Sequence, residues 1–270
     1  GVVPLSDGAG EVVGLGADVS RFAVGDRVIP CFHPHWFGGQ IKPDYLTDRL
    51  GANLDGMLAE YAVVNEEAAV AMPSHLSFEE AATLPCAGVT AWSAVKGLQP
   101  GQTVVTLGAG GVSLFAIQFA KAMGARVIAT TSSSAKAEQL KALGADDTID
   151  YRRQPEWSQQ VRQLTNGRGA DRIVEVGGPG TFEQSVKSVA VGGQVSMVGA
   201  VAGVAGSIDF MPLFMSRSSF QPISVGSRQD LEDMLRFIAT HDIRPRIDSE
   251  YAFDDAKLAF QRLMTRNVFG

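Results

Sequence analysis

Thr103-Val104-Val105-Thr106-Leu107-Gly108-Ala109-Gly110-Gly111-Val112-Ser113 stands near the centre of this 270-residue sequence. A short β-branched run ends in closely spaced glycines, and apolar residues then recur at the spacing of an amphipathic helix. The pattern predicts a strand, a tight turn and a helix. Free N–H groups at a helix start attract anions, so the turn is a candidate diphosphate site. The glycine spacing alone is a weak signal, and Ser113 replaces the third glycine of the dinucleotide fingerprint.

After this run, strand and helix patterns alternate. Short apolar strands separated by helices predict a doubly wound parallel sheet, so the fold class is α/β. Ligands of such sheets bind at the carboxyl ends of the strands, where Gly177 and Gly199 fall. Closely spaced strand patterns earlier in the chain, including one at 57–64, predict a separate β-rich domain. Ser77 and Glu80 form a capping box that predicts a helix start.

The composition excludes several classes of protein. Charged residues make up 19% and apolar residues 45% of the chain, which is typical of a globular protein. The net charge of −6 and the lack of a basic cluster argue against nucleic acid and anionic membranes as partners. No apolar run is long enough to span a membrane. The two cysteines indicate a reducing compartment, so we expect a cytoplasmic protein.

The end of the second predicted strand indicates which dinucleotide binds. A carboxylate there would hold the ribose 2′-hydroxyl and repel a 2′-phosphate. Residues 129–134 contain no acid but several hydroxyls, and Lys136 follows. Hydroxyl and ammonium groups donate hydrogen bonds to phosphate, so NADP(H) is favoured over NAD(H). The alternative is that Ser134 only caps the next helix and that Lys136 is solvated.

Seven motifs in a fixed order carry a resemblance to a known family. They are 8–13 (Gly-Ala-Gly-Glu-Val-Val), 24–28, 81–92, 108–113, 143–146, 174–180 and 225–228. Over essentially its whole length the chain resembles the medium-chain dehydrogenase/reductase superfamily, in its zinc-lacking alcohol dehydrogenase-like and quinone oxidoreductase-like branch. The resemblance implies a Rossmann domain inserted into a GroES-like catalytic domain.

This resemblance also implies the domain boundaries. A partial GroES-like domain would cover 1–88, the Rossmann domain 89–226, and a return to the catalytic domain 227–270. Relatives carry about fifty further residues upstream, so we interpret the sequence as a fragment that lacks the N-terminal part. The resemblance further implies a homodimer or another homo-oligomer.

Residues that hold the dinucleotide can be assigned by the same resemblance. The diphosphate would contact Gly108, Gly110, Gly111 and Val112. The 2′-phosphate would contact Ser132, Ser133, Lys136 and Tyr151. Thr90 would lie beside the nicotinamide, and Gly177, Val198, Gly199 and Gly226 would line the rest of the path.

Zinc-dependent relatives place a His-Glu pair before the Gly-Ala-Gly turn and a cysteine before Ala-Gly-Val-Thr. Cys86 matches that cysteine, but Ser6 and Asp7 replace the pair. A catalytic zinc takes three protein ligands, so we predict that no metal is bound. Cys31, His33 and His35 alternate in sequence and could share one face. With no fourth ligand close by, loop histidines are the favoured interpretation.

These observations predict an NADPH-dependent, zinc-independent oxidoreductase that transfers hydride to a carbonyl, enone or quinone. The cofactor carries the chemistry, and the protein supplies orientation and a dry pocket. The sequence assigns no catalytic residue; Asp7, Trp36, Tyr61 and Trp92 are candidates for the pocket wall. One alternative is an NAD(P)-dependent alcohol dehydrogenase that works in oxidation. Another is a nucleotide-binding relative, non-enzymatic or truncated. The substrate would be a small-molecule carbonyl compound whose identity the sequence does not specify.

Overall fold

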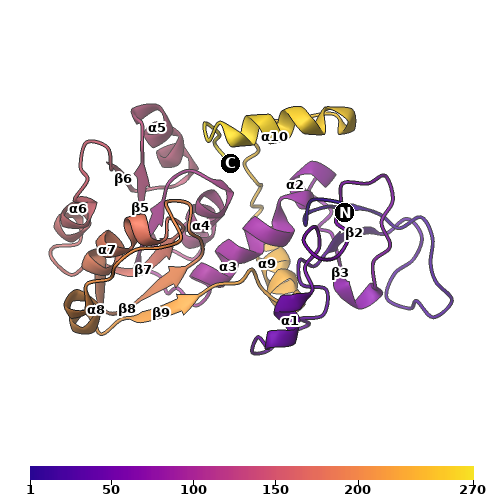
Figure 1. Cartoon of the computed structure of the whole chain (residues 1–270), viewed down its shortest axis with the longest axis horizontal. Coiled ribbons are helices and arrows are strands. Elements are labelled where there is room, and N and C mark those ends of the chain that lie inside the picture. Colours follow the sequence, from indigo (N-terminus) through magenta and orange to yellow (C-terminus); the bar gives the residue numbers. More distant parts are fainter. The chain divides into compact units, whose positions relative to one another are not determined.

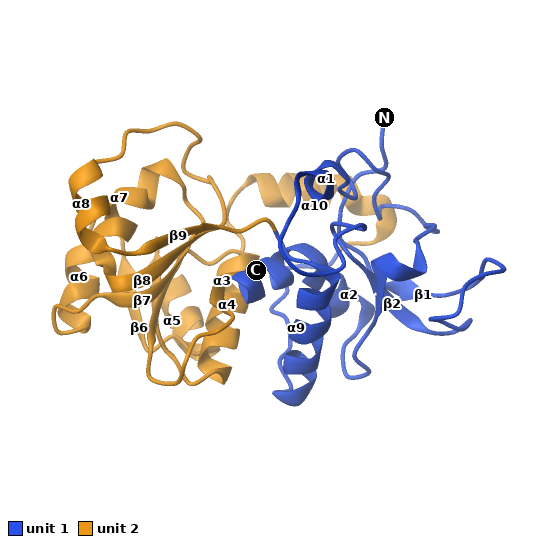
Figure 2. Cartoon of the chain, turned by 90° about the horizontal axis from the view of Figure 1, so that it is seen from below, with its two compact units in different colours: residues 1–93, 225–250 blue, residues 94–224, 251–270 orange.

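The computed structural model describes all 270 residues, which form two compact units. Unit 1 comprises residues 1–93 and 225–250, and unit 2 comprises 94–224 and 251–270 (Figure 2). Their elements can be followed along the chain in Figure 1. No helix is both long enough and apolar enough to cross a membrane.

Unit 2 is built on a six-stranded sheet in the order β6-β5-β4-β7-β8-β9, with every neighbouring pair parallel. The strands are β4 (Thr103–Leu107), β5 (Arg126–Thr131), β6 (Asp147–Asp150), β7 (Ala170–Glu175), β8 (Val189–Met197) and β9 (Ser219–Pro222). The predicted doubly wound sheet is therefore confirmed. The chain runs outward from β4 in both directions, so the carboxyl end of β4 is the switch point at which such sheets bind ligands.

Helices connect these strands. They are α4 (Gly111–Ala122), α5 (Ser134–Leu143), α6 (Trp157–Leu164), α7 (Pro179–Ser188) and α8 (Phe210–Ser216). All five residues of β4 are buried, which explains the continuous apolar run that marks this strand in the sequence. Val105, Ile128, Ile173 and Val195, each fully buried, join four neighbouring strands in the core.

Residues 251–270 contain η3 (Phe253–Asp255) and α10 (Ala256–Met264). The predicted boundaries assigned this stretch to the GroES-like domain, whereas in the structure it groups with unit 2. Neither element buries a residue, so neither forms a core of its own. The segment that follows bonds to unit 2 instead, because the Gly270 N–H donates to the Ala109 carbonyl at 3.2 Å.

Unit 1 holds a three-stranded antiparallel sheet of β1 (Gly10–Glu11), β2 (Arg27–Pro30) and β3 (Ala69–Ala71). Its helical elements are α1 (Pro43–Thr47), η1 (Glu66–Ala68), α2 (Phe78–Ala82), η2 (Leu84–Gly88), α3 from Val89 onward (Val89–Val95), and α9 (Arg228–Thr240). The Ser77–Glu80 capping box is present with both of its hydrogen bonds. Pro85 lies in the wide helical turn η2 that follows α2.

The strand predicted at 57–64 is wrong, because the structure has no strand there. The N–H groups of Gly56, Met57 and Leu58 donate to carbonyls of residues 3–5 in an irregular order rather than as a ladder. The alternating pattern therefore has no regular strand to pair with, and alternation of side chains alone does not make a sheet.

Candidate functional site

The turn between β4 and α4 has the geometry expected of a diphosphate-binding site. Gly108 adopts a φ of +76°, which favours glycine, and Gly110 is the N-cap residue of α4. No side chain caps this helix start. A Cβ atom added at Gly108 or Gly110 would meet nothing within 4 Å, so the space beside both glycines is open. An open helix N-terminus at the switch point fits a dinucleotide diphosphate.

The other helices that follow the strands begin differently. Amides at the starts of α5, α6 and α7 donate to side-chain oxygens of Ser133, Gln184 and Glu175, respectively. The short helix α8 is capped by Asp209. α6 and α7 also lack a side-chain N-cap, and α7 begins with a proline. The α4 start is instead set apart by its place after the central strand β4 and by the open space beside Gly108 and Gly110.

The turn after β5 carries the groups predicted to bind the 2′-phosphate. The helix cap is Ser133 rather than Ser134, and its Oγ accepts the Lys136 N–H at 3.3 Å. Ser132 precedes it in the same turn, and no carboxylate lies in this segment. The Lys136 ammonium donates to the Val268 carbonyl at 2.9 Å, so it is held at this edge rather than fully solvated.

Tyr151, which follows β6, lies beside this turn. Its N–H donates to the Thr131 carbonyl at the end of β5 at 3.0 Å, and its side chain is 40% exposed. The four residues predicted for the 2′-phosphate therefore lie at the carboxyl ends of two neighbouring strands. Their contact with a phosphate stays a prediction.

The turns after β7 and β8 are joined to each other. The Glu175 carbonyl accepts the N–H groups of Val198 at 2.8 Å and Gly199 at 3.3 Å. A Cβ atom at Gly199 would lie 2.9 Å from a backbone carbonyl oxygen, and one at Gly177 would lie 2.2 Å from the Thr181 hydroxyl. Close packing therefore requires glycine at both positions, and it brings Gly177, Val198 and Gly199 together.

Thr90 and Gly226, the two remaining predicted contacts, belong to unit 1. Thr90 lies near the start of α3 and is buried. A Cβ atom at Gly226 would lie 2.4 Å from the Val89 side chain, so the segment before α9 packs closely against the start of α3.

Unit 1 also contains a partly buried acidic group that sequence reasoning named only as a wall residue. The Ser6 hydroxyl donates to Asp7 at 2.6 Å, and the backbone N–H of Cys86 also hydrogen-bonds this carboxyl. Burial raises the pKa of Asp7 from 3.8 to about 6, against the lowering effect of these two hydrogen bonds. The Cys86 thiol in turn hydrogen-bonds Thr90. Asp7, Cys86 and Thr90 thus form one connected cluster, which only the folded chain could reveal.

This cluster does not make a complete zinc site. Burial, followed by the nearby Asp7 charge, raises the pKa of the Cys86 thiol to about 12. Asp7 and Cys86 are two potential ligands where a catalytic zinc takes three. No group of three or more His, Cys, Asp or Glu side chains in the chain is arranged to hold a metal ion.

The alternating residues Cys31, His33 and His35 do not converge on a metal either. Cys31 is buried, and burial raises its pKa to about 12. His35 instead approaches Asp48 at 2.9 Å, with the ring at the surface. Burial lowers the pKa of His33, which favours a neutral ring. Cys31 and His33 are therefore buried in the packing of the loop, whereas His35 is not.

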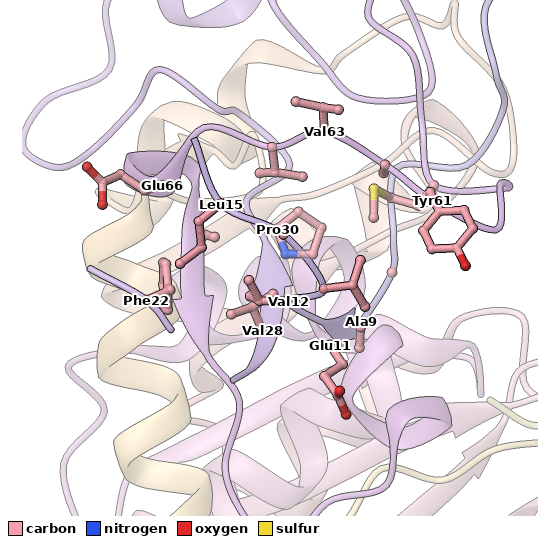
Figure 3. A pocket seen from close by; sticks show the side chains of 18 of the residues that line it. Ala9, Glu11, Val12, Leu15, Phe22, Val28, Pro30, Tyr61, Val63 and Glu66 are labelled. Atoms are coloured by element: carbon pink, nitrogen blue, oxygen red, sulfur yellow. The ribbon is translucent and has the colours of Figure 1, made fainter. Parts of the chain in front are cut away.

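A hollow of about 500 Å³ in unit 1 is a second candidate for a ligand site (Figure 3). Tyr61, named from the sequence as a pocket wall, does line it. In Figure 3 the Glu11 and Glu66 carboxylates and the Tyr61 hydroxyl point away from its centre, where Val12, Val28 and Pro30 lie. None of the residues predicted to contact the dinucleotide lines this hollow, so it is not the predicted cofactor site.

The two tryptophans named as possible walls take part in aromatic packing. Trp36 stacks on Tyr45 with ring centroids 6.4 Å apart, and Trp92 lies 5.1 Å from Phe237. His241 is the C-cap residue of α9.

Comparison with known proteins identifies related sequences over both units. The alcohol dehydrogenase GroES-like domain model matches residues 1–74, and the zinc-binding dehydrogenase model matches residues 111–240. A zinc-type alcohol dehydrogenase-like protein of Schizosaccharomyces pombe is 41% identical, over 96% of this chain and 78% of the relative. A quinone oxidoreductase of Pseudomonas aeruginosa is 32% identical, over 98% of this chain and 79% of the relative.

Solved structures agree with these matches. One from Sinorhizobium meliloti, provisionally described as an alcohol dehydrogenase, is 42% identical with a TM-score of 0.94 and covers 100% of this chain and 80% of its own. A mycobacterial protein complexed with NADPH is 27% identical with a TM-score of 0.81 and covers 98% of this chain and 80% of its own. The predicted combination of a GroES-like and a Rossmann-like domain is therefore confirmed.

Proposed function

The chain belongs to the medium-chain dehydrogenase/reductase superfamily of oxidoreductases, and from this premise we propose that it is an NADPH-dependent, zinc-independent enzyme that reduces a carbonyl, enone or quinone. The observation that carries the proposal is the uncapped α4 start beside a strand end that offers hydroxyls and a lysine in place of an acid. A relative named as a quinone oxidoreductase supports the substrate class. The NADPH complex of a structural neighbour supports the cofactor.

In this proposal the protein binds and orients both reactants. The α4 amides donate hydrogen bonds to the diphosphate, and Lys136 exchanges the neutral Val268 carbonyl for the charged 2′-phosphate, which forms the stronger hydrogen bond. When bound, reduced nicotinamide supplies the hydride. Neutralising the substrate oxygen then requires a proton, for which the sequence identified no source.

We propose Asp7 as the group that holds this proton. It shares a hydrogen-bonded cluster with Thr90, the residue expected beside the nicotinamide. A carboxyl whose pKa is about 6 remains partly protonated near neutral pH, which suits a general acid. The Ser6 hydroxyl, which donates to this carboxyl at 2.6 Å, can relay a proton to it from solvent, taking up one proton as it gives the other.

Alcohol oxidation is the second candidate, because a relative at 41% identity is named as alcohol dehydrogenase-like. The same cluster would serve it in reverse, with ionised Asp7 accepting the proton of the alcohol. The two directions are separated by steady-state rates with matched alcohol–ketone pairs and matched saturated–unsaturated carbonyl pairs. The same rates measured with and without a chelator test the zinc independence.

Cofactor preference is tested by titrating the fluorescence of NADPH and NADH against the protein. We expect tighter binding of NADPH. Lys136→Ala combined with Ser133→Asp should reverse the preference, since it removes an ammonium and adds a repelling carboxylate. Lys141→Ala is the matched control, because Lys141 lies in the same helix and pairs with exposed Glu138 at 3.2 Å. Unchanged preference in the double variant would refute the 2′-phosphate assignment.

We also propose that the protein is a homo-oligomer, located in the cytoplasm, with neither nucleic acid nor a membrane as partner. Large apolar side chains on α8 support the first part, since Phe210, Met211, Phe214 and Met215 are each more than half exposed. Light scattering on the purified chain tests it, and a monomer at micromolar concentration would contradict it.

A further inference from the structure

A buried carboxylate lies where β7 ends. Glu175 is 1% exposed, and its Oε1 accepts the N–H groups of Gly177 at 2.7 Å and Gly178 at 3.0 Å. The same oxygen accepts the Thr181 hydroxyl at 2.5 Å, and Oε2 accepts the Ser185 hydroxyl. Every donor comes from the turn after β7 or from the helix α7 that this turn begins. The side chain therefore ties the turn to its own helix.

Burying a carboxylate costs free energy unless hydrogen bonds compensate for the loss of water. Here four donors converge on the Glu175 carboxylate, so the side chain and the turn depend on each other. Glu175 does determine the conformation of the turn, because two consecutive amides converge on one oxygen atom. Gly178 adopts a φ of +79°, which also depends on this arrangement.

The main chain of Glu175 extends the constraint to the next strand. Its carbonyl accepts the Val198 and Gly199 N–H groups, and the Gly177 carbonyl accepts the Ala202 N–H at 2.7 Å. One residue thus holds the turn after β7 through its side chain and the turn after β8 through its backbone. Both turns lie at the carboxyl edge of the sheet, on the opposite side of β4 from the predicted 2′-phosphate site.

We propose that Glu175 is a positioning residue that holds these two turns in the conformation that receives the nicotinamide half of the cofactor. The inference rests on the proposed function, since it assumes that a dinucleotide extends along this edge. It assigns to Glu175 no contact with the substrate or the cofactor.

Three substitutions separate the geometry of the side chain from its charge. Glu175→Gln keeps an oxygen for the two amides and Thr181, and its amide group can donate to Ser185 once that hydroxyl turns. Glu175→Asp keeps the charge but is shorter by one carbon–carbon bond, about 1.5 Å, and cannot reach all four donors. Glu175→Ala leaves the turn amides without their acceptor.

The readout is the affinity for two ligands that differ only by the nicotinamide half. Binding of NADPH and of adenosine 2′,5′-bisphosphate is measured by calorimetry on the full chain. Glu175→Ala and Glu175→Asp should weaken NADPH binding at least about tenfold while changing affinity for the bisphosphate less than about twofold. Glu175→Gln should retain NADPH affinity within about threefold. A loss of structure would weaken both ligands equally.

Thr181→Val serves if the Glu175 variants do not fold, because it removes one hydroxyl donor with almost no change of shape. It should weaken NADPH about threefold or more and leave the bisphosphate unaffected. The positioning role is overturned if the affinities for both ligands fall equally. It is also overturned if NADPH affinity is unchanged in variants that lack the hydrogen bonds. Failure of the unsubstituted chain to bind either ligand would instead overturn the proposed function.

Discussion

Replacing Asp7 by asparagine should change how the stability of the protein depends on pH. In the folded chain, burial raises the pKa of this carboxyl from 3.8 to about 6. Between these two values the folded state holds a proton that the unfolded state has lost. Stability contributed by the protonated group is therefore present at low pH and is lost as the pH rises through 6. Asparagine is neutral at every pH and does not show this loss.

The size of the effect follows from the shift. A difference of about two pH units at about 1.36 kcal/mol per unit gives an upper bound of about 3 kcal/mol. Between pH 4.5 and 7.5 about 2 kcal/mol of this falls within the measured range. Asp7 retains some exposure to solvent, which reduces the penalty for its charge, so we expect the Asn variant to gain about 1–2 kcal/mol relative to the parent chain.

Urea unfolding at six pH values between these limits, with a chelator present, measures the difference. The prediction concerns how the difference in unfolding free energy between the two proteins changes with pH. Asp18→Asn is the control, because it removes a carboxylate from an exposed loop of the same unit and makes the same change in net charge. A free-energy difference for the Asp7 variant that stays constant from pH 4.5 to 7.5 would refute the burial argument.

Four further results are expected. Gly110→Val should lower cofactor affinity at least about tenfold, because the new side chain enters the space proposed for the diphosphate. The free energy of unfolding should change by about 1 kcal/mol or less, because that space is open in the chain. Calorimetry measures the affinity, and unfolding curves measure the stability. Gly199→Ala, with a Cβ only 2.9 Å from a carbonyl oxygen, should lose stability instead, and the reverse pattern would contradict the geometry. The pKa values of Cys31 and Cys86 are raised to about 12, so neither thiol should react with a disulfide reagent at pH 8 until denaturant is added. Rapid reaction of the folded protein with the reagent would instead show an accessible thiolate. Asp7→Asn should reduce kcat/KM for carbonyl reduction about 100-fold and remove its fall above pH 6, so persistence of that fall would exclude Asp7 as the proton donor.

The sequence was sufficient for the parallel sheet because both of its signals are local. The central strand β4 is a β-branched and apolar run whose five residues are all buried. The helix α5 ends at a glycine, Gly144. The strand predicted at 57–64 failed because a strand also needs a partner, and its backbone bonds with residues 3–5 instead. Pairing depends on residues distant in sequence, which alternation does not encode.

Features of the candidate site that escaped prediction share the same cause. Asp7 owes its raised pKa to burial in the folded unit and lies beside Cys86, which is far along the chain. Lys136 donates to Val268, a residue 132 positions away. Glu175 has partners close in sequence, yet a glutamate at the end of a strand predicts a solvated side chain far more often than a buried one. Sequence reveals residue types, whereas burial and convergence are properties of the fold.

The same distinction explains how a weak glycine motif becomes a specific site. Several helices begin at the carboxyl edge of this sheet, and the general attraction of helix starts for anions applies to all of them. At α5 the Ser133 hydroxyl already accepts the Lys136 N–H, and in the turn before α7 Glu175 accepts the N–H groups of Gly177 and Gly178. An anion arriving at either place would have to displace an oxygen of the chain itself. At Gly110 it would displace only solvent. The specificity for α4 therefore comes from its place at the switch point of the sheet and from the glycines that leave its start open, as well as from the side chains that occupy neighbouring amides.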